Sequence, residues 1–206
     1  MLRVVSSHLD LSSGDIFSPI NFPISAGISL VSAGSLGRRE QRNRTRFFKQ
    51  MKIRPESVWG LKQVHSRKVF VVDRLQEEEL EGDGLITKDP QLVLTVTVAD
   101  CFPIFLFDSE SHAYGVLHSG TRGTGIVKNA IDVMAEHFGT KVEDLWISLG
   151  PGIGPCCYRV DEERAMSFAE QWGDNCVVER ANGWYLDLAQ ANFSILERKG
   201  VRRLFH

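Results

Sequence analysis

The sequence predicts an α+β fold in which mixed β-sheets are flanked by helices. A run of β-branched residues from Leu92 to Val98 is typical of a central strand, and apolar residues recur at helical spacing from Ile126 to Phe138. Strands and helices alternate along the chain without the strict cadence of βαβ units. A length of 206 residues with 43% hydrophobic residues indicates a single domain, residues 1–206, with a core of its own.

The first third of the chain predicts short strands and one helix. Ser, Gly and Pro are frequent in the first 35 residues, which we expect to form short strands and loops. The segment from Gly37 to Lys52 has the pattern of an amphipathic helix, with Phe47 and Phe48 on its apolar side. Two strand pieces are predicted between Val58 and Val72, on either side of the tripeptide Gln63-Val-His65.

The middle of the chain predicts a strand, a tight turn and a helix. The strand extends from about His112 to Leu117, and the apolar helix from Ile126 to Phe138 follows the turn. Thr124 is the predicted N-cap of this helix, because a hydroxyl can accept a hydrogen bond from its first turn. Gly139 is the predicted stop signal, because glycine readily adopts the left-handed conformation found after helices.

The last third predicts a strand, an irregular segment and two helices. Leu145 to Leu149 is the predicted strand. The glycines and prolines from Gly150 to Tyr158 forbid regular structure. The helices are expected from about Asp161 to Trp172 and from Leu186 to Lys199.

Composition and charge exclude several classes of protein. The 24 Lys and Arg residues are balanced by 26 Asp and Glu, so the chain offers no general basic surface for nucleic acid. The first residues lack the apolar segment of a secretory signal, and no stretch approaches the roughly 20 apolar residues of a membrane span. Four cysteines are too few for a disulfide scaffold. We therefore expect a cytoplasmic protein with reduced thiols and no membrane or nucleic-acid partner, and we expect Cys156 and Cys157 to be buried.

Three candidate metal ligands lie at or next to strand ends: His65, Cys101 and His118. Strand ends can converge on one cleft although they are distant in sequence. Two histidines and one cysteine, with one position open, suit a catalytic zinc ion, whereas structural zinc normally takes four protein ligands. The alternative for each residue is structural: a packed core cysteine and hydrogen-bonded histidines.

The turn from Gly120 to Gly125 is a candidate phosphate site. Its small residues let backbone N–H groups face an anion at a helix N-terminus, and Arg122 adds a fork of donors, with Gly123 and Thr124 beside it. The alternative is a tight turn whose arginine pairs with a surface carboxylate. Neither the Walker pattern nor the dinucleotide-binding pattern is present, so nucleoside triphosphates and NAD are not favoured.

Two carboxylates are candidates for orienting a histidine or transferring a proton. Asp83 ends an acidic stretch that begins at Glu77, and Asp100 directly precedes Cys101. The alternatives are a turn residue for Asp83 and a carboxylate that satisfies loop N–H groups for Asp100.

Read together, five motifs resemble the laccase-domain family, formerly described as multicopper polyphenol oxidases. The motifs are Gln63-Val-His65, Gly82-Asp-Gly-Leu-Ile-Thr87, Ala99-Asp-Cys101, His118-Ser-Gly-Thr-Arg-Gly-Thr124 and Gly150-Pro-Gly-Ile-Gly-Pro-Cys-Cys-Tyr158. The resemblance covers about residues 40 to 200. It implies a fold similar to that of cysteine-hydrolase toxins.

The resemblance also implies an activity. Members of the family are regarded as zinc-dependent purine nucleoside phosphorylases with adenosine deaminase activity. It implies that His65, Cys101 and His118 bind zinc and form the catalytic site. It further implies that purine nucleosides and phosphate are the small-molecule ligands. The loop that carries Arg122 and the pair Asn43-Arg44 would take part in binding them.

Some positions depart from the family pattern. The family's N-terminal His-Gly-Phe-Ser-Thr-Arg motif is replaced by the segment Asp15–Ile24, which has no arginine, and Thr121 stands in place of a tryptophan. The family's C-terminal Cys-Thr and Ser-Tyr-Arg-Arg motifs are absent from the sequence, which ends at His206. These departures concern substrate affinity and specificity more than zinc binding.

Three other functions remain open at this level. The first is a copper-dependent polyphenol oxidase. A multicopper cluster needs many more histidine ligands than the six histidines of this sequence can supply. The second is a metal-free hydrolase with Cys101 as nucleophile and His118 as base. The third is a regulatory protein that binds zinc without turnover.

Overall fold

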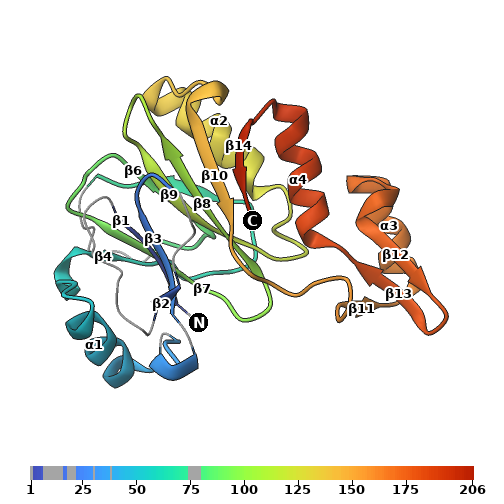
Figure 1. Ribbon diagram of the computed structural model, residues 1–206, viewed down its shortest axis with the longest axis horizontal. Coiled ribbons are helices and arrows are strands. Elements are labelled where there is room, and N and C mark those ends of the chain that lie inside the picture. The colour runs from blue at the N-terminus through green and yellow to red at the C-terminus, as the bar shows by residue number, and fades with distance from the viewer. Residues whose placement is uncertain (1, 7–15, 18–21, 30, 38, 74–79) are drawn as a thin grey trace.

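The computed structural model describes residues 2–6, 16–17, 22–29, 31–37, 39–73 and 80–206. In these residues the chain forms three β-sheets and four α-helices (Figure 1). Strands pair both parallel, as in β5 with β6, and antiparallel, as in β8 with β9. The predicted α+β class with mixed sheets is therefore confirmed.

Two larger sheets form the body of the structure. The first has the order β2-β3-β1-β7-β4. Its strands are Ile16–Phe17, Ser25–Ser29, Leu2–Ser6, Val93–Thr97 and Val58–Trp59. The second has the order β14-β10-β8-β9-β6-β5. Its strands are Arg203–Phe205, Leu145–Leu149, Phe102–Asp108, Tyr114–Ser119, Gly84–Thr87 and Val69–Val71.

A small third sheet and the helices complete the architecture. The third sheet has the order β11-β13-β12, with bounds Arg159–Val160, Gly183–Leu186 and Val177–Arg180. The α-helices α1 to α4 span Gln41–Gln50, Ile126–Phe138, Glu162–Trp172 and Leu188–Lys199. Single 3-10 turns occupy Val31–Ala33, Pro55–Ser57, Val142–Asp144 and Asp174–Cys176.

The second sheet is the central layer because its strands are buried on both faces. In β8, Ile104 and Leu106 point into a core shared with the helices, whereas Phe105 and Phe107 point into a core shared with the first sheet. Successive side chains of a strand point to opposite faces, so a strand covered on both sides is apolar throughout. All seven residues of β8 are buried.

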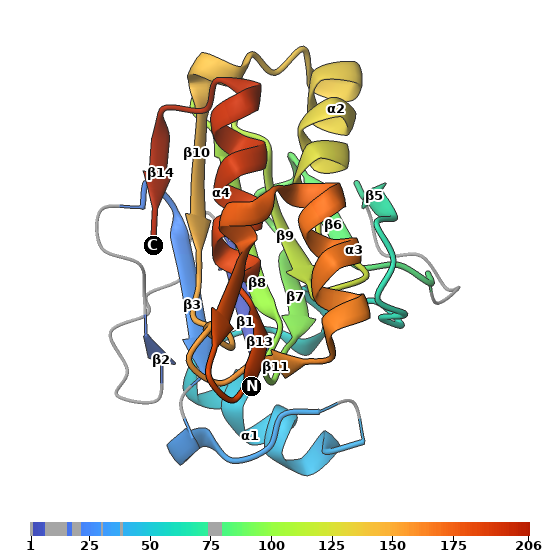
Figure 2. The same ribbon diagram turned by 90° about the vertical axis from the view of Figure 1, so that its right-hand side faces the viewer.

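Helices cover the outer faces of the two larger sheets. The helices α2 and α4 pack on the second sheet (Figure 2), where Ile131 and Ile195 join the core of its outer face. On the other side of the molecule, α1 packs Phe47 and Phe48 beside Val93 of the first sheet. Among the metal-ligand candidates, Cys101 directly precedes β8 and His118 lies near the end of β9, whereas His65 lies in the turn before β5.

Most predicted elements are found, with shifted ends. The helix predicted from Gly37 to Lys52 is α1, which is shorter, and the predicted central strand is β7, which lies between β1 and β4. Gly139 ends α2 in the left-handed conformation, as predicted. Residues 7–15 and 18–21, which include part of the departing N-terminal segment, lie outside the described residues.

One predicted cap is wrong, and several strands were not predicted. The N-cap of α2 is Gly125, not Thr124, because the Thr124 hydroxyl donates to the carbonyl oxygen of Gly120 at 3.0 Å. The unpredicted strands are β6, β8, β11, β12, β13 and β14. None of the helices in the described part of the chain combines the length and the apolar character that a membrane crossing needs.

Gly115 of β9 tests the close packing of the central sheet. A Cβ atom at this position would lie 2.8 Å from the Leu85 carbonyl oxygen, which is too close for two strands held in register. We expect Gly115→Ala to lower the free energy of unfolding by about 1–3 kcal/mol, measured by urea denaturation. In Gly37→Ala the new atom has only Ser35 Oγ near it, at 3.8 Å, so this control should stay within about 0.5 kcal/mol. Equal stability of the two variants would contradict the packing argument.

Candidate metal centre

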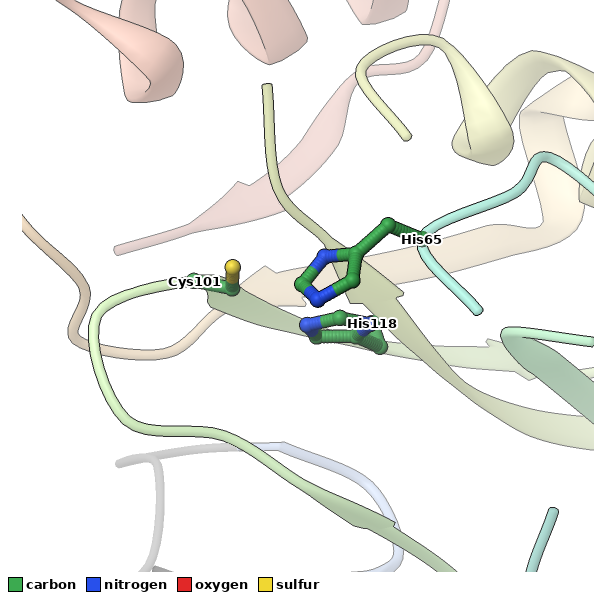
Figure 3. Close-up of side chains that lie close together, drawn as sticks. All are labelled: His65, Cys101 and His118. Carbon is green, nitrogen blue, oxygen red and sulfur yellow. The ribbon is translucent and has the colours of Figure 1, made fainter. Parts of the chain in front are cut away.

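The structure brings His65, Cys101 and His118 together. Their ligand atoms all lie within 4.8 Å of one another, and no other such group is found in the described part of the chain (Figure 3). The two imidazole rings are 4.7 Å apart between centroids and inclined by 61°. Both rings turn a nitrogen atom toward the side where the Cys101 sulfur lies. Tetrahedral zinc separates such donors by about 3.5 Å, so small side-chain rotations would bring these three to a metal ion.

Strand register explains why Cys101 and His118 meet. In the antiparallel pair of β8 and β9, Pro103 lies opposite His118 and Phe102 opposite Ser119. Cys101 therefore comes opposite Gly120, on the face to which His118 also points. Gly120 has no side chain in this space: a Cβ atom there would lie 2.6 Å from Cys101 Sγ and 3.3 Å from His65 Nδ1. A glycine is thus required for the three donors to converge.

Asp83 holds both histidines. It directly precedes β6, and its Oδ1 lies 2.8 Å from His118 Nδ1, which leaves His118 Nε2 to face the metal-ligand cluster. The same fully buried carboxylate accepts hydrogen bonds from the backbone N–H groups of Val64, His65 and Ser66 and from the Ser66 hydroxyl. A carboxylate that orients a ligating imidazole in this way is a common feature of zinc sites.

The turn that carries His65 has an unusual backbone. His65 adopts a φ of 57°, which is uncommon for a residue other than glycine and costs conformational free energy. Three successive N–H groups converge on Asp83 in this turn, and such a concave arrangement of donors stabilises an anion. The carboxylate therefore compensates for the strained turn that presents His65.

Hydrogen bonding shifts the pKa values of the buried pair. Burial opposes ionisation of Asp83, but hydrogen bonds from His118 and Ser66 outweigh it and lower the pKa of Asp83 to about 2. Burial likewise opposes protonation of His118, but the bonds to Asp83 and Cys101 outweigh it and raise the pKa of His118 to about 9. In the metal-free chain, the pair is therefore an aspartate and an imidazolium near neutral pH.

His65 has the opposite tendency. Its partial burial lowers the pKa of the imidazole, and the positive charges of His118 and Arg122 lower it further, although Asp83 opposes them. The neutral imidazole is the form that binds a metal. Arg122 thus contributes a positive charge that acts on the His65 imidazole.

A pocket of about 760 Å³ opens beside the three donors. Its wall is formed by Ser35, Gly37, Lys62, Gln63, His65, Thr97, Val98, Ala99, Asp100, Cys101 and His118. The Gln63 side chain spans one side of it, donating from Nε2 to the Thr97 carbonyl and accepting from the Thr97 N–H with Oε1. Asp100 is exposed, and its carboxylate belongs to the pocket rather than to the core.

The predicted phosphate loop divides into internal and exposed parts. The Arg122 side chain is exposed, but Gly123 and Thr124 are buried. A Cβ atom at Gly123 would lie 3.1 Å from the Ser66 carbonyl oxygen, so this glycine lets the loop pack against the turn of His65. The Thr124 hydroxyl is used within the loop, as its bond to Gly120 shows. Arg122 is therefore the side chain of the three that is available to a ligand.

Asn43 and Arg44 lie on α1 and hold the segment beside the pocket. Asn43 donates to the Ser35 carbonyl oxygen and Arg44 to that of Leu36. Ser35 lines the metal-site pocket, whereas Arg44 lines a neighbouring cavity of about 650 Å³ that shares Gln63 and Thr97 with it. The structure thus places these two residues behind the pocket wall rather than at the metal ligands.

Several contributors to the site had no predicted role. Gln63 stood within a quoted motif, but its bonds to the Thr97 backbone depend on a pairing between distant segments that no local pattern reveals. Ser66 directly follows His65, and its hydroxyl donates to Asp83. A serine at this position of a turn could have indicated such a bond from the sequence. The prediction that Cys156 and Cys157 are buried is wrong: both are exposed in a turn, with their sulfur atoms 3.1 Å apart.

One family model, described as multi-copper polyphenol oxidoreductase laccase, matches residues 36–205. The chain belongs to this family. The family predicted from the five motifs is therefore confirmed, over a larger share of the chain than those motifs occupy.

Relatives within the family have names that refer to purine nucleosides. A purine nucleoside phosphorylase of Deinococcus radiodurans is 33% identical over 182 residues, which are 87% of this chain and 71% of that protein. Purine nucleoside phosphorylase LACC1 of Mus musculus is 33% identical over 149 residues, 71% of this chain but 34% of the relative, so the chain spans about a third of that protein. Adenosine deaminase RL5, from an unknown prokaryotic organism, is 35% identical over 155 residues, 68% of this chain and 59% of the relative.

Solved structures of similar proteins share the fold. YlmD from Geobacillus stearothermophilus superposes with a TM-score of 0.74 at 25% identity, covering 98% of this chain and 78% of that one. The Bacillus licheniformis protein YfiH gives a TM-score of 0.72 at 26% identity, covering 80% of this chain and 68% of that one.

The Asp83–His118 pair predicts a pH dependence of stability in the metal-free chain. Asp83 stabilises the fold above its unfolded pKa of 3.8, and this contribution is lost as the pH falls through about 2. His118 contributes below its unfolded pKa of 6.5, and its share is lost as the pH rises through about 9. In urea unfolding with a chelator present, Asp83→Asn should cost about 2 kcal/mol between pH 4 and 6.5, and less outside that window.

Glu110→Gln is the matched control for this measurement, because it neutralises an exposed carboxylate. Its free energy of unfolding should follow that of the unsubstituted chain at every pH. A cost of Asp83→Asn that stays constant from pH 3 to pH 10 would show that the pair does not titrate as described.

Gly120 gives a test of the metal centre that leaves all three ligands in place. The added Cβ atom of Gly120→Ala would overlap the Cys101 sulfur, so we expect zinc affinity to fall by about tenfold or more, measured by competition with a chelator. Gly154→Ala is the control, because its new atom meets only Cys156 Sγ at 3.6 Å. Unchanged zinc affinity in Gly120→Ala would mean that the sulfur is not a ligand.

Proposed function

We propose that the chain catalyses zinc-dependent phosphorolysis of purine nucleosides, including adenosine, inosine and methylthioadenosine, to the free base and ribose 1-phosphate. Adenosine deamination is proposed as a second reaction at the same site. The observation that carries the proposal is the convergence of His65, Cys101 and His118 beside a pocket of about 760 Å³. The names of the relatives support the substrate class.

The donor set fits zinc. Two neutral imidazoles and a thiolate are ligands of catalytic zinc sites, with a fourth position left for solvent or substrate. His118 is oriented by Asp83 and Cys101 is accommodated by Gly120, so each donor has a defined position. When bound here, zinc would act as a Lewis acid and lower the pKa of a water molecule.

Arg122 is the proposed phosphate-binding residue. Its guanidinium is exposed, close enough to His65 to lower the pKa of that imidazole, and attached to a loop fixed by Gly120 and Gly123. A guanidinium binds phosphate through two parallel hydrogen bonds, and fixing the anion lowers the entropic cost of the reaction. Gly123 and Thr124 then serve by shaping the loop that carries Arg122.

In phosphorolysis, a phosphate oxygen attacks C1′ of the ribose and the bond from C1′ to the purine nitrogen breaks. The electron pair of that bond goes to the purine, which leaves more readily when an acid protonates it. Asp100 is the proposed group for this proton transfer because it lines the pocket, and in its protonated form it would give the proton to the purine. Asp83 is buried under several hydrogen bonds and acts as a positioning residue for His65 and His118.

In deamination, water adds to C6 of adenine, ammonia leaves and inosine is formed. The two reactions attack different ends of the nucleoside, so each requires its own orientation in the pocket. The volume of the pocket leaves room for both.

A metal-free cysteine hydrolase is the second candidate, and one observation favours it. Asp83, His118 and Cys101 lie in the order acid, base and thiol, with His118 hydrogen-bonded to Asp83 and the Cys101 sulfur within 4.8 Å of it. This order resembles that of a nucleophilic triad. Such an enzyme would keep its activity in a chelator, which the proposed zinc enzyme would not.

Product analysis with adenosine tests the proposal. Adenine and ribose 1-phosphate should form only when phosphate is present, whereas inosine should form in its absence as well. We expect His65→Ala and His118→Ala each to lower both rates by about 100-fold or more, because each removes a zinc ligand. His137→Ala, which alters an exposed histidine of α2, is the control and should keep full turnover.

The same assay separates the other functions. Turnover that persists after chelation would indicate the hydrolase, and oxidation of a phenol by a copper-loaded chain would indicate the oxidase. Stoichiometric zinc without any product from adenosine, inosine or methylthioadenosine would indicate a regulatory zinc protein.

A further inference from the structure

A further cavity, of about 250 Å³, is lined by residues of α2, α3 and α4 and of the turn before β5. We call it the helix-junction cavity. Its lining residues are Arg67, Gly125, Lys128, Asn129, Trp172, Ile195, Arg198 and Lys199. It shares none of them with the pocket at the metal ligands, so it is a separate site.

The helix-junction cavity is strongly basic. Four of the described residues that line it are cationic, and none of them is acidic. Lys128 and Lys199 both pair with Asp132, at 2.8 and 2.6 Å. Arg67 and Arg198 form no ion pair with a carboxylate in the described part of the chain, so two guanidinium charges remain without a counter-ion there. The N-terminus of α2, capped by Gly125 without a side-chain bond, adds a partial positive charge.

Two residues of the cavity wall also carry a buried donor that has no acceptor among the described residues. The donors are Nε of Arg67 and Nε1 of Trp172. The Arg67 guanidinium lies over the Trp172 ring, 5.1 Å from its centre, so the two donors belong to one stacked pair. Leaving a buried N–H without a partner costs about 1–3 kcal/mol, and more for a charged group, so such donors usually mark a bound ion or water.

The stacked pair is held rigidly. Asn129 donates from Nδ2 to the Arg67 carbonyl oxygen at 2.9 Å, and the Trp172 ring packs on Gly125 so closely that a Cβ atom there would lie 2.7 Å from Cη2. The Arg67 backbone and the Trp172 ring are therefore fixed before a ligand arrives, which lowers the entropic cost of binding.

We propose that the helix-junction cavity binds the phosphate group of a small molecule. Guanidinium groups are donors that phosphate prefers, and the N-terminus of α2 adds a favourable partial positive charge. A volume equal to about eight water molecules exceeds the size of one phosphate ion, so the cavity also has room for a sugar attached to it. Free phosphate and a sugar phosphate are the two sources of this chemistry.

Tryptophan fluorescence of the intact chain tests the proposal, because Trp172 is part of the cavity wall. Inorganic phosphate and ribose 5-phosphate are titrated at constant ionic strength, with ribose as the uncharged control. We expect a saturable change in emission with both phosphates and none with ribose. Tighter binding of ribose 5-phosphate would identify a sugar phosphate as the ligand class, and equal affinity would identify free phosphate. The change should disappear in Trp172→Phe and remain in Trp184→Phe.

Charge variants give the affinity test. Arg67→Gln and Arg198→Gln should each raise the dissociation constant at least tenfold. Because Arg198 is exposed, its substitution should not unfold the chain, so weaker binding in Arg198→Gln would reflect the lost charge. Lys88→Gln removes one exposed charge outside the cavity and should change the constant less than twofold. Arg122→Gln should also leave it unchanged. Equal weakening by Lys88→Gln, or loss of the signal in Arg122→Gln, would overturn the proposal.

Discussion

The buried carboxylate of Asp83 is the interaction on which the rest of the site depends. A carboxylate with no exposed surface would be strongly destabilising if it were unpaired. Here it accepts from three backbone N–H groups, a hydroxyl and an imidazole. Those same bonds define the left-handed turn at His65 and the ring orientation of His118. One buried anion therefore positions two of the three metal-ligand candidates, and its removal would disturb both at once.

The third candidate depends on strand register rather than on a hydrogen bond. Cys101 is placed by the pairing of β8 with β9, and these strands are held in register because both of their faces are buried. A slip of one residue would move Ile104 and Phe105 to the wrong cores and turn Cys101 away from His118. The packing of the second sheet between the first sheet and the helices thus determines the geometry of the site, and Gly120 keeps the space that this register requires.

Elements with a pronounced period could be predicted from the sequence, and elements without one could not. The helix α2 buries one face and so shows helical spacing, and β7 shows the β-branched content of a strand. In β8 both faces are buried, so it has no alternation, and Pro103 further obscured it. The small sheet has short strands that are partly exposed, which leaves little pattern to detect. The three metal-ligand candidates could be proposed from strand ends, whereas the bonds of Gln63 and Asp83 arise only when distant segments pair.

The acidic stretch that ends at Asp83 shows this limit most clearly. In sequence, Asp83 continues a run of carboxylates, and such a run usually lies in solvent. In the structure, the environment of the side chains changes within two residues. Glu81 is exposed and paired with Lys62, whereas Asp83 is buried under the turn of His65. Gly82 allows this change, because a side chain there would overlap the ring of Phe70 at 2.7 Å.

The turn of residues 64–67 serves both the metal centre and the helix-junction cavity, and its rigidity keeps them separate. Asp83 holds its first three N–H groups, Gly123 packs against the Ser66 carbonyl oxygen, and Asn129 holds the Arg67 carbonyl oxygen. Three separate segments thus hold the backbone of this turn: the residue before β6, the loop before α2, and α2 itself. Because the backbone between His65 and Arg67 has so little freedom, an anion bound by the Arg67 side chain would leave the His65 imidazole in place. Two sites only two residues apart in sequence can therefore bind different ligands without competing for one conformation.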